Sequence, residues 1–350
     1  MTNSWRLSVP ETALALAALI AGCGEKSPAV KTVDELVDDA AAALSAADMK
    51  AAETAISNAW LKASGDVDVR LLKAEFDFHS RDYDSAAKIF RGIAEDGTLS
   101  RQLRAQGWSG LGVVEQCGNA RDAARLDFLR ALRLDRRNAS AWYHLGYIYY
   151  NDYGYYEAAT DCYETFVRLE TTADERVLKV QRSVIPALRD ARTNSILEIP
   201  GSRTPDRAGC LKDLQEAEAA MKKKTFKTAR LRYEAALKAD PTSFPAALGL
   251  AQLLKTTDFT PDGKKKTLEY YRRACKLSPS SISAFLAAGE FAAATGNHLT
   301  ARELFSRAVA SDPTNTTAID GLIRALRKTN QTKTASLYQR YRDFLAVKIK

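Results

Sequence analysis

Small and large apolar residues recur along the chain with a spacing that suits helices packed in pairs. Trp108 and Trp142 lie 34 positions apart, and each opens the pattern Trp-x-x-Leu-Gly. Each is followed by an alanine and an aromatic residue at nearly matching offsets, namely Ala124 and Phe128, then Ala159 and Tyr163. Apolar residues three or four positions apart predict amphipathic helices, and small residues among them allow two helix axes to approach closely. The pattern therefore predicts pairs of packed helices.

Copies of this pattern extend on both sides of the two tryptophans. The first block comprises units at about 33–66, 67–100, 105–138 and 139–172, with four extra residues before the third unit. Four further units follow between residues 210 and 350, and the last of them ends in a polar, basic helix. One helix pair cannot bury its apolar face alone, so neighbouring pairs must stack to complete a core.

These units resemble the tetratricopeptide repeat (TPR), a helix–turn–helix of 34 residues with the signature Trp-x-x-Leu-Gly, then Ala, then Phe or Tyr. The resemblance implies an all-α, TPR-type helix–turn–helix solenoid of about eight repeats in two blocks of four. It also implies a non-enzymatic protein that holds a protein or peptide partner against the first helices of its units. One repeat scaffold serves many partners, so the fold does not identify the partner.

Residues 173–209 interrupt the pattern. Apolar residues three or four apart, suited to an amphipathic helix, occur here at Val177, Val180, Val184 and Leu188. Pro186 inside this helix predicts a kink or a break. Residues 193–209 then carry several turn-forming residues. The sequence predicts a capping helix and a linker between a first TPR block at 33–172 and a second at 210–350.

The first 22 residues have the composition of an export signal. An apolar run of about a dozen residues ends at Ile20-Ala21-Gly22-Cys23, and such a run is too short to cross a bilayer. The segment resembles a bacterial lipobox. That resemblance implies removal of residues 1–22, a lipid on Cys23 and a tether over 23–32, with a lipid-anchored protein in the cell envelope, at the outer membrane facing the periplasm. The alternative is a simple cleaved signal with an incidental cysteine.

Charge is distributed unevenly. Residues 24–172 carry 18 Lys and Arg against 24 Asp and Glu, a net charge of −6, whereas residues 210–350 carry 25 against 13, a net charge of +12. Two lysine triplets contribute to the basic half: Lys222, Lys223 and Lys224, then Lys264, Lys265 and Lys266. Both are predicted at the turn between the two helices of consecutive units, where they would form one basic ridge for an anionic partner. The alternative is ordinary solvated lysine, and no nucleic acid is expected for an exported protein.

Tyrosines are concentrated in the fourth unit. Its first helix places Tyr143, Tyr147 and Tyr150 three and four positions apart, followed by Asn151, whereas Tyr149 falls at a core position. Tyrosine gives a large contact area at low entropic cost, so these residues are predicted to line a partner-binding groove. The alternative is that they pack against the capping helix.

Residues that could carry catalysis or bind a metal are sparse. The three histidines, His79, His144 and His298, all lie inside repeat units, and neither H-E-x-x-H nor C-x-x-C occurs. We therefore predict no catalytic residues, no metal site and no cofactor. The four cysteines after Cys23 are Cys117, Cys162, Cys210 and Cys275. They are predicted to be structural thiols, with a disulfide as the alternative.

Together these features predict a lipid-anchored TPR adaptor or scaffold. It would mediate protein–protein interaction during assembly of the bacterial envelope or of an appendage such as a pilus or secretion system. The alternative function is a glycan- or nutrient-binding surface lipoprotein that uses the tyrosines as a stacking platform.

Overall fold

The computed structural model describes residues 31–170, 175–199 and 204–347. Within these ranges the chain consists of helices and connecting turns, without a β-strand. It divides into two compact units, residues 1–145 (unit 1) and residues 146–350 (unit 2). The boundary falls inside α7 (Ala139–Ile148). The predicted all-α, TPR-type solenoid is confirmed.

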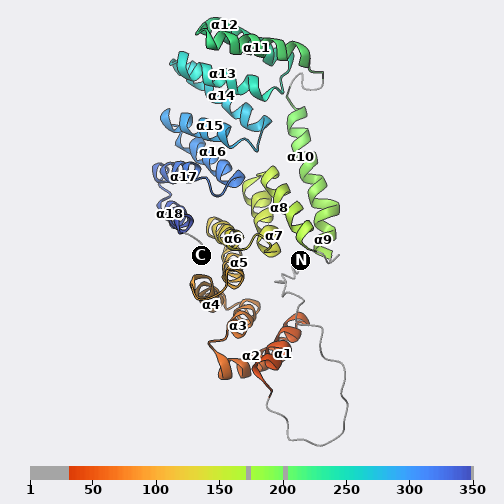
Figure 1. Cartoon of the computed structure of the whole chain (residues 1–350). Helices are drawn as coiled ribbons and strands as arrows, with labels where there is room; N and C mark the ends of the chain where they lie inside the picture. Colours follow the sequence, from red (N-terminus) through yellow and green to blue (C-terminus); the bar gives the residue numbers. More distant parts are fainter. Residues whose placement is uncertain (1–30, 171–174, 200–203, 348–350) are drawn as a thin grey trace, which may run out of the picture. The chain divides into compact units, whose positions relative to one another are not determined.

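Unit 1 contains three helical hairpins and the first part of α7 (Figure 1, red to yellow). The hairpins are α1 (Val33–Ser45) with α2 (Met49–Ala63), α3 (Val67–His79) with α4 (Tyr83–Glu95), and α5 (Arg101–Cys117) with α6 (Arg121–Leu134). The first two begin where the sequence pattern predicts. The four extra residues before the third unit extend α5 by one turn, because Ser100 caps the helix by accepting the Leu103 N–H at 3.3 Å.

Polar N-caps mark the start of most helices in unit 1, and a left-handed turn residue follows the first helix of each hairpin. Thr32 and Glu35 form a capping box at the start of α1, and Asp66 accepts two backbone N–H groups at the start of α3. The turn residue between the paired helices has a positive φ in each hairpin: Ala47, Arg81 and Asn119. Each turn is closed by a backbone hydrogen bond from the next residue to a carbonyl five positions earlier, as in Asp82 N to Asp77 O at 2.8 Å.

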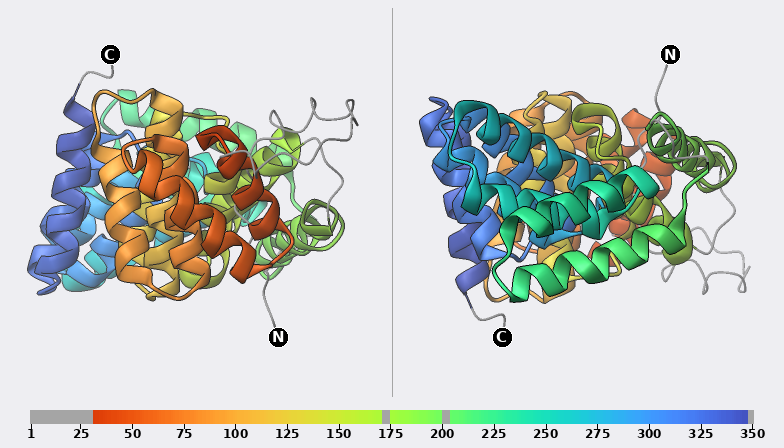
Figure 2. Two further views of the ribbon diagram at one scale, coloured as in Figure 1. Left: turned by 90° about the horizontal axis from the view of Figure 1, so that it is seen from below. Right: turned by 90° about the horizontal axis from the view of Figure 1, so that it is seen from above.

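Unit 2 starts with the end of α7, followed by η2 (Tyr149–Tyr153) and α8 (Tyr156–Leu169). A helical rod follows, made of α9 (Glu175–Lys179), η3 (Val180–Val184) and α10 (Ile185–Leu197). Four hairpins complete the unit: α11 (Arg207–Lys222) with α12 (Phe226–Ala239), α13 (Phe244–Thr257) with α14 (Pro261–Leu277), α15 (Ile282–Ala294) with α16 (His298–Ser311), and α17 (Thr316–Lys328) with α18 (Thr332–Ala346). Figure 2 shows α11 and α12 packed side by side as one such hairpin.

The helical rod of α9, η3 and α10 confirms part of the prediction made for residues 173–209, namely a helix with a break near Pro186. Pro186 lies in the first turn of α10, and the π-helical segment η3 precedes it, so the α-helical hydrogen-bonding pattern breaks there as expected. Leu188 is fully buried, and the rod packs against α8. The prediction that the linker begins at residue 193 is wrong, because α10 continues to Leu197.

Glycines placed against aromatic rings produce the tight helix packing in both units. In unit 1, a Cβ atom at Gly112 would lie 2.8 Å from Phe128 Cε1. In unit 2, a Cβ atom at Gly146 would lie 3.1 Å from Tyr163 Cδ1. A side chain at Gly112 would require the Phe128 ring to shift, and one at Gly146 would crowd the Tyr163 ring. The close helix approach expected at the glycine of the Trp-x-x-Leu-Gly pattern is therefore observed in both repeats.

The lengths and apolar character of the helices in the described part of the chain decide whether any of them could span a membrane. None of the helices described there is both long and apolar enough to cross a bilayer. The predicted signal at 1–22 and the lipidation site Cys23 lie outside the described residues.

Candidate protein-binding surface

The tyrosines predicted to form a groove lie on two adjoining segments, α7 and η2. Tyr143 and Tyr147 are in α7, whereas Tyr150 and Asn151 are in the π-helical segment η2. The unit boundary separates Tyr143, in unit 1, from the other three residues, in unit 2. Tyr143 is half-buried, and its ring meets the His144 ring edge-on at a centroid distance of 5.3 Å.

The π-helix accommodates one additional residue of the fourth repeat, in which Trp142 and Ala159 are 17 positions apart, against 16 for Trp108 and Ala124 in the third repeat. The Tyr155 N–H reaches back to Tyr149 O at 2.8 Å, and Gly154 adopts a left-handed φ of +64° between them. A π-helical turn is wider than an α-helical turn. Tyr150 and Asn151 are therefore rotated around the helix relative to where α-helical spacing would place them.

Within unit 2 the tyrosines differ in exposure. Tyr149 is 1% exposed, which confirms its predicted core position, and its ring lies 6.2 Å from that of Tyr155. Tyr147 is half-buried, whereas Tyr150 is 39% exposed. The ring contact of Tyr150 is with Tyr156, which is 38% exposed, at a centroid distance of 6.2 Å and an interplanar angle of 55°.

The resulting surface is an open pair of tyrosine rings with an amide beside it. Asn151 is exposed, and its Nδ2 donates to Tyr147 O at 3.1 Å, which holds the side chain against the helix. Tyr156 was missed at the sequence level, although the run Tyr155-Tyr156 after Gly154 was a signal for it. We name Tyr150, Tyr156 and Asn151 the tyrosine pair site.

The first lysine triplet lies where the sequence predicts. Lys222 ends α11, Lys223 is the C-cap, and Lys224 is the turn residue with a φ of +58°. All three side chains are exposed. This triplet therefore presents three positive charges at the α11–α12 turn.

The prediction that the second triplet also lies in a turn is wrong. Lys264, Lys265 and Lys266 are in the first two turns of α14. The helix begins before them because Thr260 is its N-cap and accepts the Gly263 N–H at 3.0 Å, with Pro261 at the first helical position. The triplets therefore do not occupy equivalent turns, which removes the reason for expecting one ridge.

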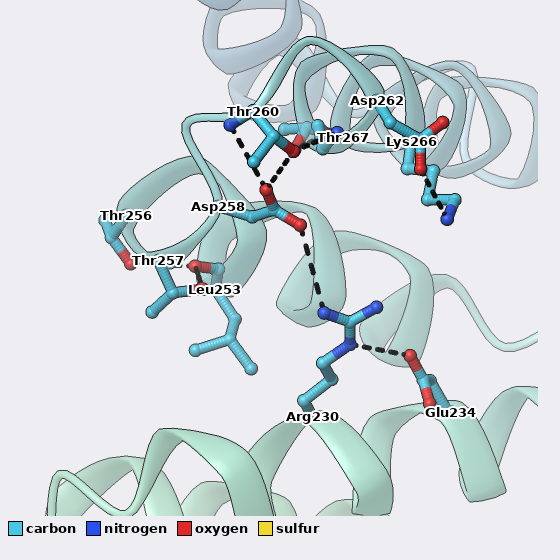
Figure 3. Close-up of polar contacts among 11 residues, drawn as sticks. Arg230, Glu234, Leu253, Thr256, Thr257, Asp258, Thr260, Asp262, Lys266 and Thr267 are labelled. Carbon is cyan, nitrogen blue, oxygen red and sulfur yellow. Dashed lines mark hydrogen bonds and ion pairs between the residues drawn. The ribbon is translucent and has the colours of Figure 1, made fainter.

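Acidic groups neighbour the second triplet, as Figure 3 shows. Asp262 pairs with Lys266 at 2.7 Å and raises the pKa of that ammonium group. Asp258 accepts the Thr260 hydroxyl at 2.6 Å, and this hydrogen bond holds the pKa of the Asp258 carboxyl below its usual value. Arg230 of α12 lies 3.9 Å from Asp258. The local charge is mixed, so this part of the surface is less basic than the lysine run alone indicates.

Two carboxylates of unit 1 have unusual surroundings that the sequence pattern did not single out. Asp127 is buried and paired with Arg130, whose guanidinium lies 4.8 Å from the Trp108 ring centroid. Burial, opposed by Arg130, raises the pKa of Asp127 to about 7. Glu75 on α3 is half-buried, and burial raises its pKa to about 7 as well.

The cysteines and histidines form no metal or redox centre in the described part of the chain. Cys162, Cys210 and Cys275 are buried free thiols, and Cys117 is exposed. Burial raises the pKa of the Cys275 thiol to about 12, which makes it unreactive. Among the described residues, no group of His, Cys, Asp and Glu side chains has the arrangement of a metal site.

Comparison with known proteins concerns the fold. Residues 268–316, from α14 to the start of α17, match a family model described as the tetratricopeptide repeat. No curated protein sequence matches the chain significantly.

Similar solved structures include a TPR protein from Parabacteroides merdae, at 10% identity and a TM-score of 0.33, covering 84% of this chain and 98% of that one. Another is the C-terminal part of a TPR repeat-containing protein from Cytophaga hutchinsonii, at 16% identity and a TM-score of 0.31, covering 82% and 99%. The TPR2AB domain of yeast Sti1 in its complex with pHSP90 has 13% identity and a TM-score of 0.29, covering 87% and 98%. These values are too low to indicate a partner. The stacked hairpins and the family match at 268–316 identify the fold of the described chain as a TPR-type solenoid.

Proposed function

We propose that this protein is a non-enzymatic scaffold that binds a protein or peptide partner through its repeat helices. The observation that carries the proposal is the tyrosine pair site in unit 2. Tyr150 and Tyr156 each leave more than a third of their surface accessible, at 39% and 38%, although the rings contact each other. Tyr149 and Tyr163 of the same unit are buried, so the tyrosine pair differs from them in leaving ring surface open to a partner.

The chemistry of the pair suits peptide recognition. A tyrosine ring provides apolar contact area, its hydroxyl provides a hydrogen bond, and only two side-chain torsions must be ordered on binding. The exposed Asn151 adds an amide that can pair with a peptide backbone. Aromatic side chains are also frequent among the residues that dominate binding energy at interfaces.

The location of the scaffold is a further part of the proposal. We propose that it is lipid-anchored through Cys23 on the periplasmic side of a bacterial membrane and acts in envelope or appendage assembly. The support is the run Ile20-Ala21-Gly22-Cys23 after an apolar segment. Metabolic labelling with a fatty acid tests this directly: the label is expected on the native protein and absent from Cys23→Ser. Equal labelling of both proteins would rule out Cys23 as the anchor.

Photo-crosslinking tests the tyrosine pair site. A photoreactive amino acid at position 150 or 156 is expected to capture the same partner in intact cells. The matched control places it at Phe226, another exposed aromatic residue of unit 2, at 41% exposure, and should give no such product. Equal capture at all three positions, or none at 150 and 156, would refute the site.

A glycan ligand is the second candidate, because open aromatic rings beside an amide also suit stacking against a sugar. Binding of the purified protein to a glycan array, lost in Tyr156→Ala, would favour this function over the scaffold. A crosslinked protein partner without glycan binding would favour the scaffold.

A further inference from the structure

Three large apolar side chains are exposed at successive hairpin turns of unit 2. Phe226 is the first residue of α12 and is 41% exposed. Phe259 lies between α13 and α14 and is 70% exposed, and Leu299 lies in the first turn of α16 and is 65% exposed. A single exposed apolar residue is common on protein surfaces, whereas a recurrence at three consecutive turns indicates a contact surface.

These turns follow one another along one edge of the stacked hairpins. α12 packs against α13, α14 against α15 and α16 against α17, so equivalent turns lie on the same side of the stack (Figure 1). Contacts between hairpins agree with this. Arg230 of α12 lies 3.9 Å from Asp258 in the α13–α14 turn (Figure 3), and Arg272 of α14 donates to the Thr300 hydroxyl of α16 at 3.0 Å. The four hairpin turns form what we name the turn edge, with three exposed apolar residues: Phe226, Phe259 and Leu299.

Lysines surround the apolar residues of the turn edge. The four turns with their flanking residues carry ten lysines against two aspartates, a net charge of +8, over residues 222–227, 255–266, 295–300 and 328–333. Lys222, Lys223 and Lys224 are exposed directly before Phe226. Both aspartates already form ion pairs with basic side chains of the same unit. The turn edge therefore combines apolar side chains with an excess of positive charge.

The opposite edge of the same hairpins lacks both features. It contains the connections between hairpins, which carry two lysines and two aspartates over residues 238–244, 276–282 and 310–316. These three connections all belong to the described part of the chain, and none of them has an exposed large apolar side chain. Positive charge and apolar exposure therefore coincide at one edge, which a generally lysine-rich surface would not explain.

We propose that the turn edge binds the surface of a membrane that contains anionic lipids. The lysines are attracted to the negatively charged headgroups. Phe226, Phe259 and Leu299 then enter the boundary between headgroups and acyl chains, where leaving water is favourable for apolar side chains. The inference goes beyond the proposed scaffold function, and it requires neither a lipid on Cys23 nor the tyrosine pair site.

An acidic protein is the competing occupant, because its charge would also complement the lysines. A protein partner needs a surface shaped to match the side chains that it receives. A lipid surface deforms around whatever side chain enters it, so apolar residues that belong to separate turns can all insert without matching pockets. The distribution of the three residues over three turns therefore favours the lipid surface.

Fluorescence at the turn edge tests the proposal. The full chain carries Cys23→Ser, so that no lipid anchor contributes, and an environment-sensitive fluorescent amino acid replaces Phe259 or Leu299. The matched control replaces Leu211, which is 58% exposed near the start of α11, at the end of its hairpin away from the turn. Vesicles of phosphatidylcholine and phosphatidylglycerol are expected to shift the emission at 259 and 299 to shorter wavelength and to leave that at 211 unchanged. Vesicles of phosphatidylcholine alone should give a much smaller shift, because they carry no net charge.

Variants measured with the probe at 299 separate charge from apolar insertion. Replacing the lysines at 222–224 by glutamine is expected to weaken vesicle binding at least about tenfold at low salt, and less at high salt. Phe259→Ser should weaken it about tenfold at both salt concentrations, because salt does not screen apolar burial. The matched control replaces three exposed lysines outside the turn edge by glutamine and should bind as the parent does: Lys212, Lys238 and Lys276. Thermal unfolding confirms that each variant is folded.

Three results would overturn the proposal. The first is an equal shift at 211 and 259, or none at 259. The second is an equal loss of binding in the two triple-lysine variants, because only net charge would then matter. The third is a shift at 259 with polyglutamate but not with vesicles, which would assign the turn edge to an acidic protein. None of these results bears on the tyrosine pair site, which photo-crosslinking at positions 150 and 156 tests separately.

Discussion

Gly289 lies directly against the ring of Phe305: a Cβ atom at Gly289 would be 2.9 Å from Phe305 Cε1. The same ring meets Gly321 of the next hairpin, where a Cβ atom would be 2.5 Å away. Phe305 therefore fills the space between α15 and α17, and both glycines are small because the ring occupies their side-chain volume. The packing between neighbouring repeats therefore depends on a large aromatic ring that faces two glycines.

Overpacking this interface should destabilise unit 2. Gly289→Leu must displace Phe305, and we expect it to lower the free energy of unfolding by about 1–3 kcal/mol. Lys265→Ala, at an exposed position of α14, should change it by less than about 0.5 kcal/mol. Urea denaturation followed by circular dichroism measures both. Equal midpoints for the two variants would contradict the repeat register described for α15 and α16.

A glycine at position 224 should stabilise the α11–α12 turn. Lys224 has a φ of +58°, which a residue with a Cβ atom adopts at a cost of about 1–2 kcal/mol and glycine adopts freely. We expect Lys224→Gly to raise the melting temperature. Lys223→Gly is the control, because Lys223 has a φ of −83° and glycine there only adds disorder to the unfolded chain. A lower melting temperature for Lys224→Gly would show that its side chain has a structural role.

The stability of unit 1 should depend on pH through Glu75. Burial raises the pKa of Glu75 from 4.5 to about 7. The folded state then holds more protons than the unfolded chain between these two values, so the free energy of unfolding falls as pH rises through this range. We expect Glu75→Gln to raise the free energy of unfolding by about 1–3 kcal/mol at pH 8, with a smaller gain near pH 5. Urea denaturation at both pH values measures this, and an equal gain at both would mean that ionisation of Glu75 is not the cause.

Substitutions of Tyr149 and Tyr150, which are neighbours in η2, should affect different properties: the first should lower the stability of the fold, and the second should weaken partner binding. Tyr149 is 1% exposed, so Tyr149→Ala should cost about 3–5 kcal/mol of stability. Tyr150→Ala should leave the melting temperature nearly unchanged and weaken binding of a captured partner by about 2 kcal/mol, or thirtyfold. Replacing Lys222, Lys223 and Lys224 should affect only binding that salt also weakens. Normal binding by a strongly destabilised Tyr150→Ala would place Tyr150 in the core and refute the tyrosine pair site.

The hairpins could be located from the sequence because their determinants are local. A helix pair in a repeat is defined by residues within one unit and its neighbours, so the spacing of Trp108, Gly112, Ala124 and Phe128 contains most of the required information. The structure differs from the sequence-based prediction where one or two residues set the start of a helix or the form of a turn. Thr260 and Pro261 start α14 before the second lysine triplet, and Ser100 starts α5 four residues early. An additional residue near Gly154 became a π-helix and redirected Tyr150 toward Tyr156.

The sequence by itself therefore determined the fold class, the repeat spacing and the core tyrosine Tyr149, because helical periodicity reports which side of a helix is apolar. Exposure of the Tyr150–Tyr156 pair and isolation of Glu75 were decided only by the tertiary structure. Both depend on which groups from other turns and helices surround a side chain. The spacing along one helix does not show that Lys73 forms an ion pair with Asp77, or that the protein around α3 partly shields Glu75 from water. Such surroundings form only when helices distant in sequence pack together.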